Sequence, residues 1–341
     1  MQANATVGGH ITLAFTVDTT SILPRSQGSL GIGFSIEHGV TIHATQFTHS
    51  VELPLNAGTI PEGKPDFSKR PMDTIEIYDM DNVSMKSKQI YLDFLEACRS
   101  ARLIPKCAFF EFKILIECPV SQGFGMSAAG LMAMSQILHQ FFSSHSIKQF
   151  YTIAHRIERH HGAGLGDVLG ASVGGVERRM APGAPFWPGQ AESFECICEV
   201  LLVWSPHHER HTSLYIDDPI WKERISSSGT MVMADLLEGK WTIDRWDDVL
   251  NSSQVFAQSS GMLEESHRAT IYEDISTALV EHQLQSQLAA RLCMLGTSVV
   301  VLPQRVNDLP SEESLAELEI MLNQLGYRTL ITRIAKPTSL V

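Results

Sequence analysis

The sequence of 341 residues has no long apolar run and little positive charge, and each absence excludes a class of protein. No segment reaches the roughly eighteen consecutive apolar residues that a membrane-spanning helix needs, and no basic flank precedes an apolar core at its start. Only 26 Lys and Arg residues accompany 38 Asp and Glu residues, which gives a formal net charge of -12. We therefore expect a cytoplasmic protein with neither a membrane nor nucleic acid as a partner.

Cysteine is also scarce and scattered: several of the six cysteines lie inside apolar segments, which favours reduced core thiols over a disulfide framework. Cys196 and Cys198 are predicted to share one face of a strand, because metal-binding pairs usually have wider spacing. Two common nucleotide-binding patterns are missing as well. No glycine cluster has the spacing of a dinucleotide fingerprint, and Gly63-Lys64 and Gly239-Lys240 lack the Walker context.

The hydrophobic content of 44% is enough for one large or two medium domains. Prolines and glycines crowd together at 182–192, between two patterned regions, so we predict a linker there. This division gives one domain over residues 1–185 and a second over residues 190–341. Both are mixed in secondary structure, and the succession of strands and helices in the second predicts a two-layer α+β arrangement.

Hydrophobic periodicity predicts the individual elements. In the first domain the predicted strands are 9–17, 31–45 and 112–118, and the predicted helices are 88–102, 127–142 and 147–161. In the second domain the predicted strands are 199–204, 297–303 and 328–333. The predicted helices of the second domain are 229–238, 244–260, 265–282 and 313–325.

The most informative segment is glycine-rich and runs from Pro119 to Gly130, between a predicted strand and a predicted helix. A helix N-terminus carries unpaired backbone N–H groups and a partial positive charge, and Gly123 and Gly125 let an anion approach the backbone closely. Ser127 adds a hydroxyl where a phosphate-bound cation would use one. The segment therefore predicts a phosphate-binding loop.

A second motif places two carboxylates on either side of the glycine-rich segment 162–166, with the pair Gly174-Gly175 after it. Glu158 falls near the C-terminal end of a predicted helix, which is a poor place for an anion unless a cation compensates it. By itself, Glu158 would most often be a solvated helix residue. Asp167 is explained equally well as the N-cap of a following helix. The residues alone leave these alternatives open.

In their order, these motifs resemble those of the GHMP small-molecule kinases, which include galactokinase, homoserine kinase and mevalonate kinase. The family's proline, spacer and Gly-Leu-Gly-Ser-Ser-Ala-Ala fall on Pro119 and on 123–129, with Phe124 and Met126 replacing the leucine and the first serine. The resemblance implies that one run of residues binds the phosphates of ATP: Gly123, Phe124, Gly125, Met126, Ser127, Ala128 and Ala129. It also implies Mg²⁺ as cofactor, bound by Ser127 and Glu158, and Asp167 as the catalytic residue.

Within this family, the likeness extends furthest to the archaeal pantoate kinases, through the early segment 28–33, Phe124, Met126 and the segment 164–168. The resemblance implies a GHMP kinase fold, with an N-terminal domain like domain 2 of ribosomal protein S5 and a ferredoxin-like C-terminal domain. It further implies ATP-dependent phosphorylation of the primary 4-hydroxyl of pantoate in coenzyme A biosynthesis, and it allows a homodimer. Two alternatives stay open: a related kinase for homoserine, shikimate, mevalonate or a similar acceptor, and a non-catalytic nucleotide- or metabolite-binding relative.

Two departures from the family pattern bear on the acceptor site. The lysine that some relatives carry near the start of the chain is missing, and His10 stands in that region, either near the phosphates or hydrogen-bonded to backbone. Leu30 replaces an arginine, so another arginine must bind the substrate carboxylate: Arg25, Arg156, Arg159 and Arg178 are the candidates, although each alone could be a surface charge. The predicted acceptor-binding residues are His10, Ser29, Arg156, Arg178 and Gly296.

Overall fold

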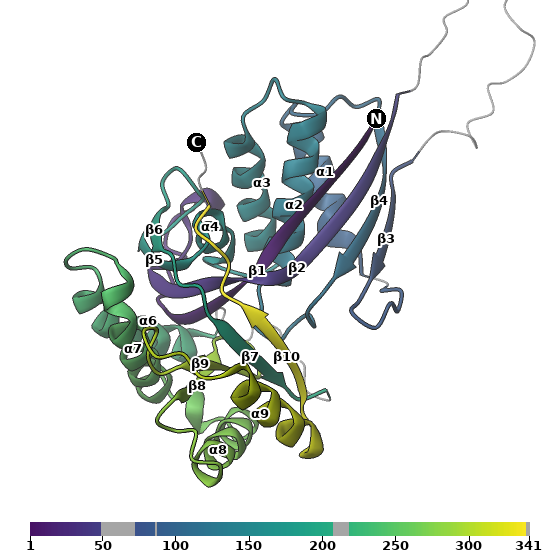
Figure 1. Ribbon diagram of the computed structural model, residues 1–341. Coiled ribbons are helices and arrows are strands. Elements are labelled where there is room, and N and C mark those ends of the chain that lie inside the picture. Colours follow the sequence, from purple (N-terminus) through teal and green to yellow (C-terminus); the bar gives the residue numbers. More distant parts are fainter. Residues whose placement is uncertain (49–71, 86, 207–217, 339–341) are drawn as a thin grey trace, which may run out of the picture.

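The structure, a computed structural model, describes residues 1–48, 72–85, 87–206 and 218–338. These residues form two β-sheets with helices packed on each (Figure 1). One continuous buried core runs through both. Among the described residues, no helix is long and apolar enough to cross a membrane.

The first sheet has six strands in the order β3-β4-β2-β5-β6, with β1 paired to β2. Their bounds are β1 Gln2–Phe15, β2 Gly31–Thr48, β3 Thr74–Tyr78, β4 Ala108–Ile116, β5 Val176–Ala181 and β6 Gln190–Phe194. All pairs are antiparallel except β3 with β4. In β4 the buried side chains alternate with more exposed ones, as expected for a sheet with one face on the core.

Four helices accompany this sheet: α1 Gln89–Ser100, α2 Met126–Phe141, α3 Ile147–His160 and α4 Asp167–Val173. Helix α2 packs on β1 and β2 and is itself flanked by α3 (Figure 1). Its position explains its composition, because small and apolar residues face neighbours on most sides. The start of α3 is fixed by a capping box between Ser146 and Gln149.

The second sheet is antiparallel, in the order β10-β7-β9-β8. Its strands are β7 Glu199–Trp204, β8 Leu288–Cys293, β9 Ser298–Pro303 and β10 Arg328–Arg333, and its helices are α6 Pro219–Leu236, α7 Trp246–Ser259, α8 Ser266–Glu281 and α9 Glu312–Gln324. Short 3-10 turns lie at 24–26, 243–245 and 262–264.

Two connections join the sheets. Residues 195–198 lead from β6 into β7, and the chain after β10 returns to the first sheet, where the N–H of Ala335 bonds to Ser35 O and that of Thr338 to Val173 O (Figure 1). This return explains one of the two neighbouring glycines: a Cβ on Gly174, which has φ 61°, would lie 2.5 Å from Lys336 O. The second sheet is therefore tied to the end of α4.

Most predicted elements are confirmed, including the helices that became α2, α3 and α8. Three predictions need correction. The helix predicted at 229–238 is only the end of α6, which begins much earlier, where Asp218 accepts hydrogen bonds from the N–H groups of Ile220 and Trp221. Cys196 and Cys198 lie in the connection between sheets rather than in a strand, with their sulfurs 3.7 Å apart. Strand β6 begins at Gln190, inside the segment 182–192 predicted as a linker, and belongs to the first sheet.

Candidate active site

One cavity of about 390 Å³ is lined by residues from both motifs singled out in the sequence. It is lined by the glycine-rich loop that precedes α2, by the loop between α3 and α4, and by Met294 and Leu295 of the second sheet's side. Two chemically different sets of side chains also line it. One set is polar and includes Ser29, Asp167 and Arg179, and the other is apolar and includes Ile77, Met85, Ile90 and Tyr91.

The glycine-rich loop lies with its backbone in conformations that favour glycine, at φ 85° for Gly123 and φ 68° for Gly125. Space is short as well. A Cβ on Gly123 would lie 3.0 Å from Cys293 O, and one on Gly125 would lie 2.8 Å from the backbone N and O of His10. The loop thus delivers the first turn of α2, with its unpaired N–H groups, to the cavity.

The two residues that depart from the family's loop pattern, Phe124 and Met126, are both buried. The ring of Phe124 meets Trp204 of β7 edge-on at a centroid distance of 5.9 Å. A Cβ on Gly9 of β1 would lie 2.6 Å from the end of the Met126 side chain. These side chains therefore anchor the loop to both sheets, while Gly123, Gly125 and Ser127 line the cavity.

Ser127 and Glu158, predicted as magnesium ligands, lie in contact: the Ser127 hydroxyl donates to Glu158 Oε1 at 2.8 Å. Glu158 is only 1% exposed, and its Oε2 has no hydrogen-bond partner among the described residues. Burial, reinforced by the nearby charge of Asp167, raises the pKa of Glu158 to about 8. The structure thus contradicts the alternative of a solvated helix residue.

A divalent cation fits this arrangement, because the orphaned carboxylate oxygen needs a positive partner. The described residues contain no cluster of three or more acidic, histidine or cysteine side chains that could hold a metal by themselves. Two protein ligands are nevertheless in keeping with Mg²⁺, which usually takes its other ligands from phosphates and water.

Asp167 is the first residue of α4, and the structure contradicts its alternative explanation as an N-cap. The N-cap is Gly166, and no side chain caps this helix. Instead, Asp167 Oδ1 lies 2.9 Å from His10 Nδ1 and accepts a longer bond of 3.4 Å from the Thr12 hydroxyl. Burial alone would raise the pKa of Asp167, but the hydrogen bond and charge of His10, with the charge of Arg179, lower it.

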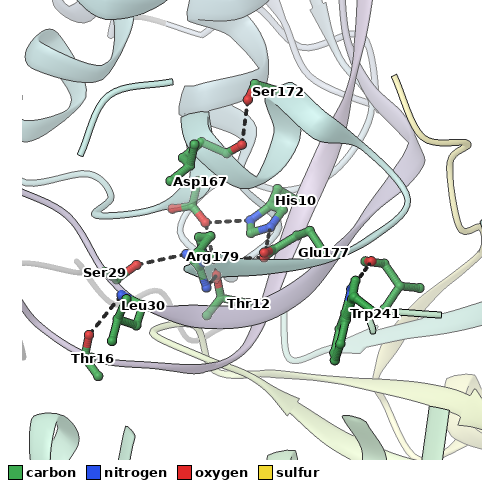
Figure 2. A network of polar contacts seen from close by, with 12 residues as sticks. His10, Thr12, Thr16, Ser29, Leu30, Asp167, Ser172, Glu177, Arg179 and Trp241 are labelled. Carbon is green, nitrogen blue, oxygen red and sulfur yellow. Dashed lines mark hydrogen bonds and ion pairs between the residues drawn. The ribbon is translucent and has the colours of Figure 1, made fainter. Parts of the chain in front are cut away.

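His10 is buried between two carboxylates, since its Nε2 lies 3.0 Å from Glu177 Oε1 (Figure 2). Burial alone would lower the pKa of His10, but the bonds to Asp167 and Glu177 prevail and raise it. The register of β1 on β2 shifts on either side of the segment from His10 to Thr12, which turns both side chains toward Asp167. The alternative of a bond to backbone is therefore wrong for this ring.

The arginine that lines the cavity is Arg179, which the sequence analysis missed. Its Nη1 donates to the hydroxyl of Ser29, which also lines the cavity, at 3.0 Å (Figure 2). Arg178, the predicted neighbour, points to the opposite face of β5, where it pairs with Glu192 and donates to the carbonyl of Gly239 at 2.8 Å. Side chains alternate along a strand, so only one of the two arginines can face the cavity.

The other predicted residues lie around the cavity rather than in it. Arg156 is exposed on α3, and Arg159 donates to Gly164 O at 3.1 Å. The guanidinium of Arg25 lies over the Trp187 ring, 4.7 Å from its centroid. Gly296 does not line the cavity but supports it, because a Cβ there would lie only 1.9 Å from Gln122 O.

Comparison with known proteins agrees with this geometry. Residues 89–175, which carry α1 to α4 and the glycine-rich loop, match the family described as GHMP kinases N terminal domain. This part of the chain is similar to the N-terminal domain of the GHMP kinases. The resemblance stated from the sequence motifs is thereby confirmed.

Two named relatives of this chain are pantoate kinases. The one from Thermococcus kodakarensis is 30% identical over 54% of this chain and 54% of its own length, so the match spans about half of that relative. The one from Methanospirillum hungatei is 25% identical over 83% of this chain and 81% of its own length.

The fold is that of the GHMP kinases, as predicted. A solved structure described as a phosphotransferase related to the CoA biosynthesis pathway covers 99% of this chain and 98% of its own, with a TM-score of 0.73. Its sequence identity is 21%, so this likeness bears on the fold alone.

Proposed function

We propose that this protein transfers the γ-phosphoryl group of ATP to the primary 4-hydroxyl of pantoate, giving 4-phosphopantoate for coenzyme A synthesis. The observation that carries the proposal is that one cavity joins the glycine-rich loop to Asp167 and Arg179. Such a site offers an anion cradle, a proton acceptor and a carboxylate-binding group together. The names of the two relatives support the choice of acceptor.

The proposed roles follow from the chemistry of phosphoryl transfer, which asks the protein mainly to align groups and to neutralise charge. The N–H groups at the start of α2 would hold the phosphates. Ser127 and Glu158 would hold Mg²⁺, which when bound neutralises phosphate charge. The apolar side chains from Ile77 to Tyr91 would offer a surface for the base of the nucleotide.

The acceptor would lie between Asp167 and Arg179. A guanidinium is suited to a carboxylate because its N–H groups are charged donors, and the Ser29 hydroxyl lies beside Arg179 Nη1. Oδ1 of Asp167 is taken by His10 and Thr12, which leaves Oδ2 for the acceptor hydroxyl. With its pKa lowered, Asp167 is ionised at neutral pH and can take the proton late, as the new P–O bond forms.

Release of ADP by the purified protein with ATP and Mg²⁺ tests the proposal, using pantoate, homoserine, shikimate and mevalonate as acceptors. We expect turnover with pantoate at a kcat/KM well above the others. Turnover with another acceptor alone would replace pantoate and leave the kinase assignment in place. Nucleotide binding without turnover on any acceptor would favour a non-catalytic relative. The contact between Ser127 and Glu158 argues against that alternative.

A further inference from the structure

Five side chains form a closed circuit of polar contacts at the acceptor end of the cavity, here named the polar ring: Asp167, His10, Glu177, Arg179 and Thr12 (Figure 2). From Asp167 Oδ1 the contacts run to His10 at 2.9 Å and on from His10 to Glu177 at 3.0 Å. Glu177 Oε1 pairs with Arg179 Nε at 3.4 Å. Thr12 closes the ring, because its hydroxyl accepts from Arg179 Nη2 and donates to Asp167, both at 3.4 Å.

Glu177 has an unusual place in this ring. It is fully buried on β5, does not line the cavity, and yet one of its oxygens meets both His10 and Arg179. Its other oxygen, Oε2, has no hydrogen-bond partner among the described residues. Gly33 of strand β2 lies beside it, where a Cβ would come 2.2 Å from Ile11 O and 3.0 Å from Glu177 Oε1. A buried carboxylate costs free energy unless cations face it, and here two do.

The two cations that Glu177 holds lead to the two ends of the acceptor site. Through His10 it acts on Asp167, the proton acceptor. It also forms an ion pair with Arg179, whose Nε lies 3.4 Å away and has no hydrogen bond among the described residues, and whose Nη1 reaches Ser29 on the cavity wall. Arg179 passes close to the backbone before Asp167, since a Cβ on Gly166 would lie 1.8 Å from Arg179 Nη1. The distance between Asp167 and Arg179 therefore depends on the contacts of one carboxylate, that of Glu177.

We propose that Glu177 is a positioning residue that sets the spacing between Asp167 and Arg179, and thereby selects hydroxy acids by the distance between their carboxylate and their hydroxyl. The proposal rests on the proposed function, because it assumes a hydroxy acid as acceptor. With His10 protonated, two positive and two negative side chains balance in the ring. Loss of the Glu177 charge would leave Arg179 free to pair with Asp167. The distance between Asp167 and Arg179 would then no longer be fixed.

The variant Glu177→Gln keeps the shape of the side chain and removes its charge. Its matched control is Glu192→Gln, because Glu192 pairs with Arg178 on the opposite face of β5. The assay measures kcat/KM for three acids whose primary hydroxyl lies on carbon 3, 4 or 5. These are 3-hydroxy-2,2-dimethylpropanoate, pantoate and 5-hydroxypentanoate, respectively. We expect Glu177→Gln to lower the preference for pantoate over the other two by about tenfold or more, a size typical of lost outer-shell partners.

The KM for ATP should stay unchanged in Glu177→Gln, and Glu192→Gln should keep the wild-type preference. An equal loss on all three acceptors, with the ratio unchanged, would reduce Glu177 to a structural role and overturn the inference. No turnover of any hydroxy acid by the wild-type protein would instead refute the proposed function. If Glu177→Gln does not fold, Glu177→Asp retains the charge at a shorter reach, and an unchanged preference there overturns the inference equally.

A measurement on the wild-type protein tests the ring without any variant of Glu177. The groups that face His10 are Asp167 from α4 and Glu177 from β5, with Arg179 beyond them. In ¹⁵N spectra of histidine-labelled protein at pH 7, His10 should carry protons on both ring nitrogens, and the variant His10→Gln assigns its signals among the 14 histidines. A neutral His10 with one unprotonated ring nitrogen would break the polar ring and overturn the inference.

Discussion

Replacing Glu158 by glutamine should make the protein more stable and inactive. The carboxyl group is 1% exposed, and burial followed by the charge of Asp167 raises its pKa from 4.5 to about 8. In the unfolded chain the group ionises at its ordinary pKa. Between these two values the folded protein holds a proton that the unfolded chain has lost, so the stability present in full below pH 4.5 is lost as the pH rises toward 8.

The size of the effect follows from the same pKa values. Within this window each pH unit lowers the free energy of unfolding of the wild-type protein by about 1.4 kcal/mol. Glutamine has the same shape, still accepts from Ser127 Oγ and does not titrate. The advantage of Glu158→Gln over the wild type should therefore grow by about 3 kcal/mol between pH 5 and pH 7. Turnover should be lost, because the variant lacks the anionic oxygen proposed to hold Mg²⁺.

Urea unfolding followed by circular dichroism at pH 5, 6, 7 and 8, with a chelator present, measures this difference. Titrations elsewhere in the chain are common to both proteins and largely cancel. The variant Glu192→Gln is the control, because it makes the same substitution at a carboxylate that is 42% exposed. The reasoning is refuted if the difference between Glu158→Gln and the wild type does not change with pH, because Glu158 would then ionise as in water.

The variant Asp167→Asn should cut turnover at saturating ATP by about a hundredfold or more, the size expected for loss of a general base, and near-normal ADP release would exclude that role. Arg179→Gln should raise the KM for the hydroxy acid by about tenfold to a hundredfold, as expected for a lost charged hydrogen bond, with the KM for ATP unchanged. Arg178→Gln should instead lower the melting temperature and leave both KM values alone; a raised acceptor KM there would reverse the assignment of the two arginines. Gly123→Ala should raise the KM for ATP, because its φ of 85° and the 3.0 Å approach to Cys293 O leave no room for a Cβ, and an unchanged KM would separate this loop from the phosphates.

The parts of the site that could be predicted are those with local signatures. The glycine-rich loop could be predicted because a strand, a turn and a helix follow one another within a short stretch of sequence. Helix α3, which carries Glu158, is strongly amphipathic and begins at a capping serine, Ser146. The family's motif order then links Ser127 to Glu158, and the structure brings the two into contact.

The acceptor end could not be predicted because its contacts join residues that are far apart in the sequence. Strand β5 reads as an exposed charged stretch, Val-Glu-Arg-Arg-Met-Ala, yet Glu177, Arg178 and Arg179 are all buried in it. Each is compensated by a partner from another element, such as Ser29 for Arg179. Because side chains alternate along a strand, only one of Arg178 and Arg179 can face the site. This could be predicted only if β5 were first recognised as a strand. Strand β8 was missed for a related reason, because Leu-Ala-Ala-Arg-Leu-Cys has the composition of a helix.

The return of the chain from β10 to the first sheet has a consequence for how the enzyme is made. The segment from Ala335 to Thr338 bonds to β2 and to the end of α4, the helix that begins with Asp167. During synthesis, β2 and α4 leave the ribosome long before this segment does. The nascent N-terminal half must therefore wait with these backbone groups uncovered, and activity should arise only after β10 has been made. Splitting the gene between the two sheets should accordingly yield fragments that regain activity only when combined.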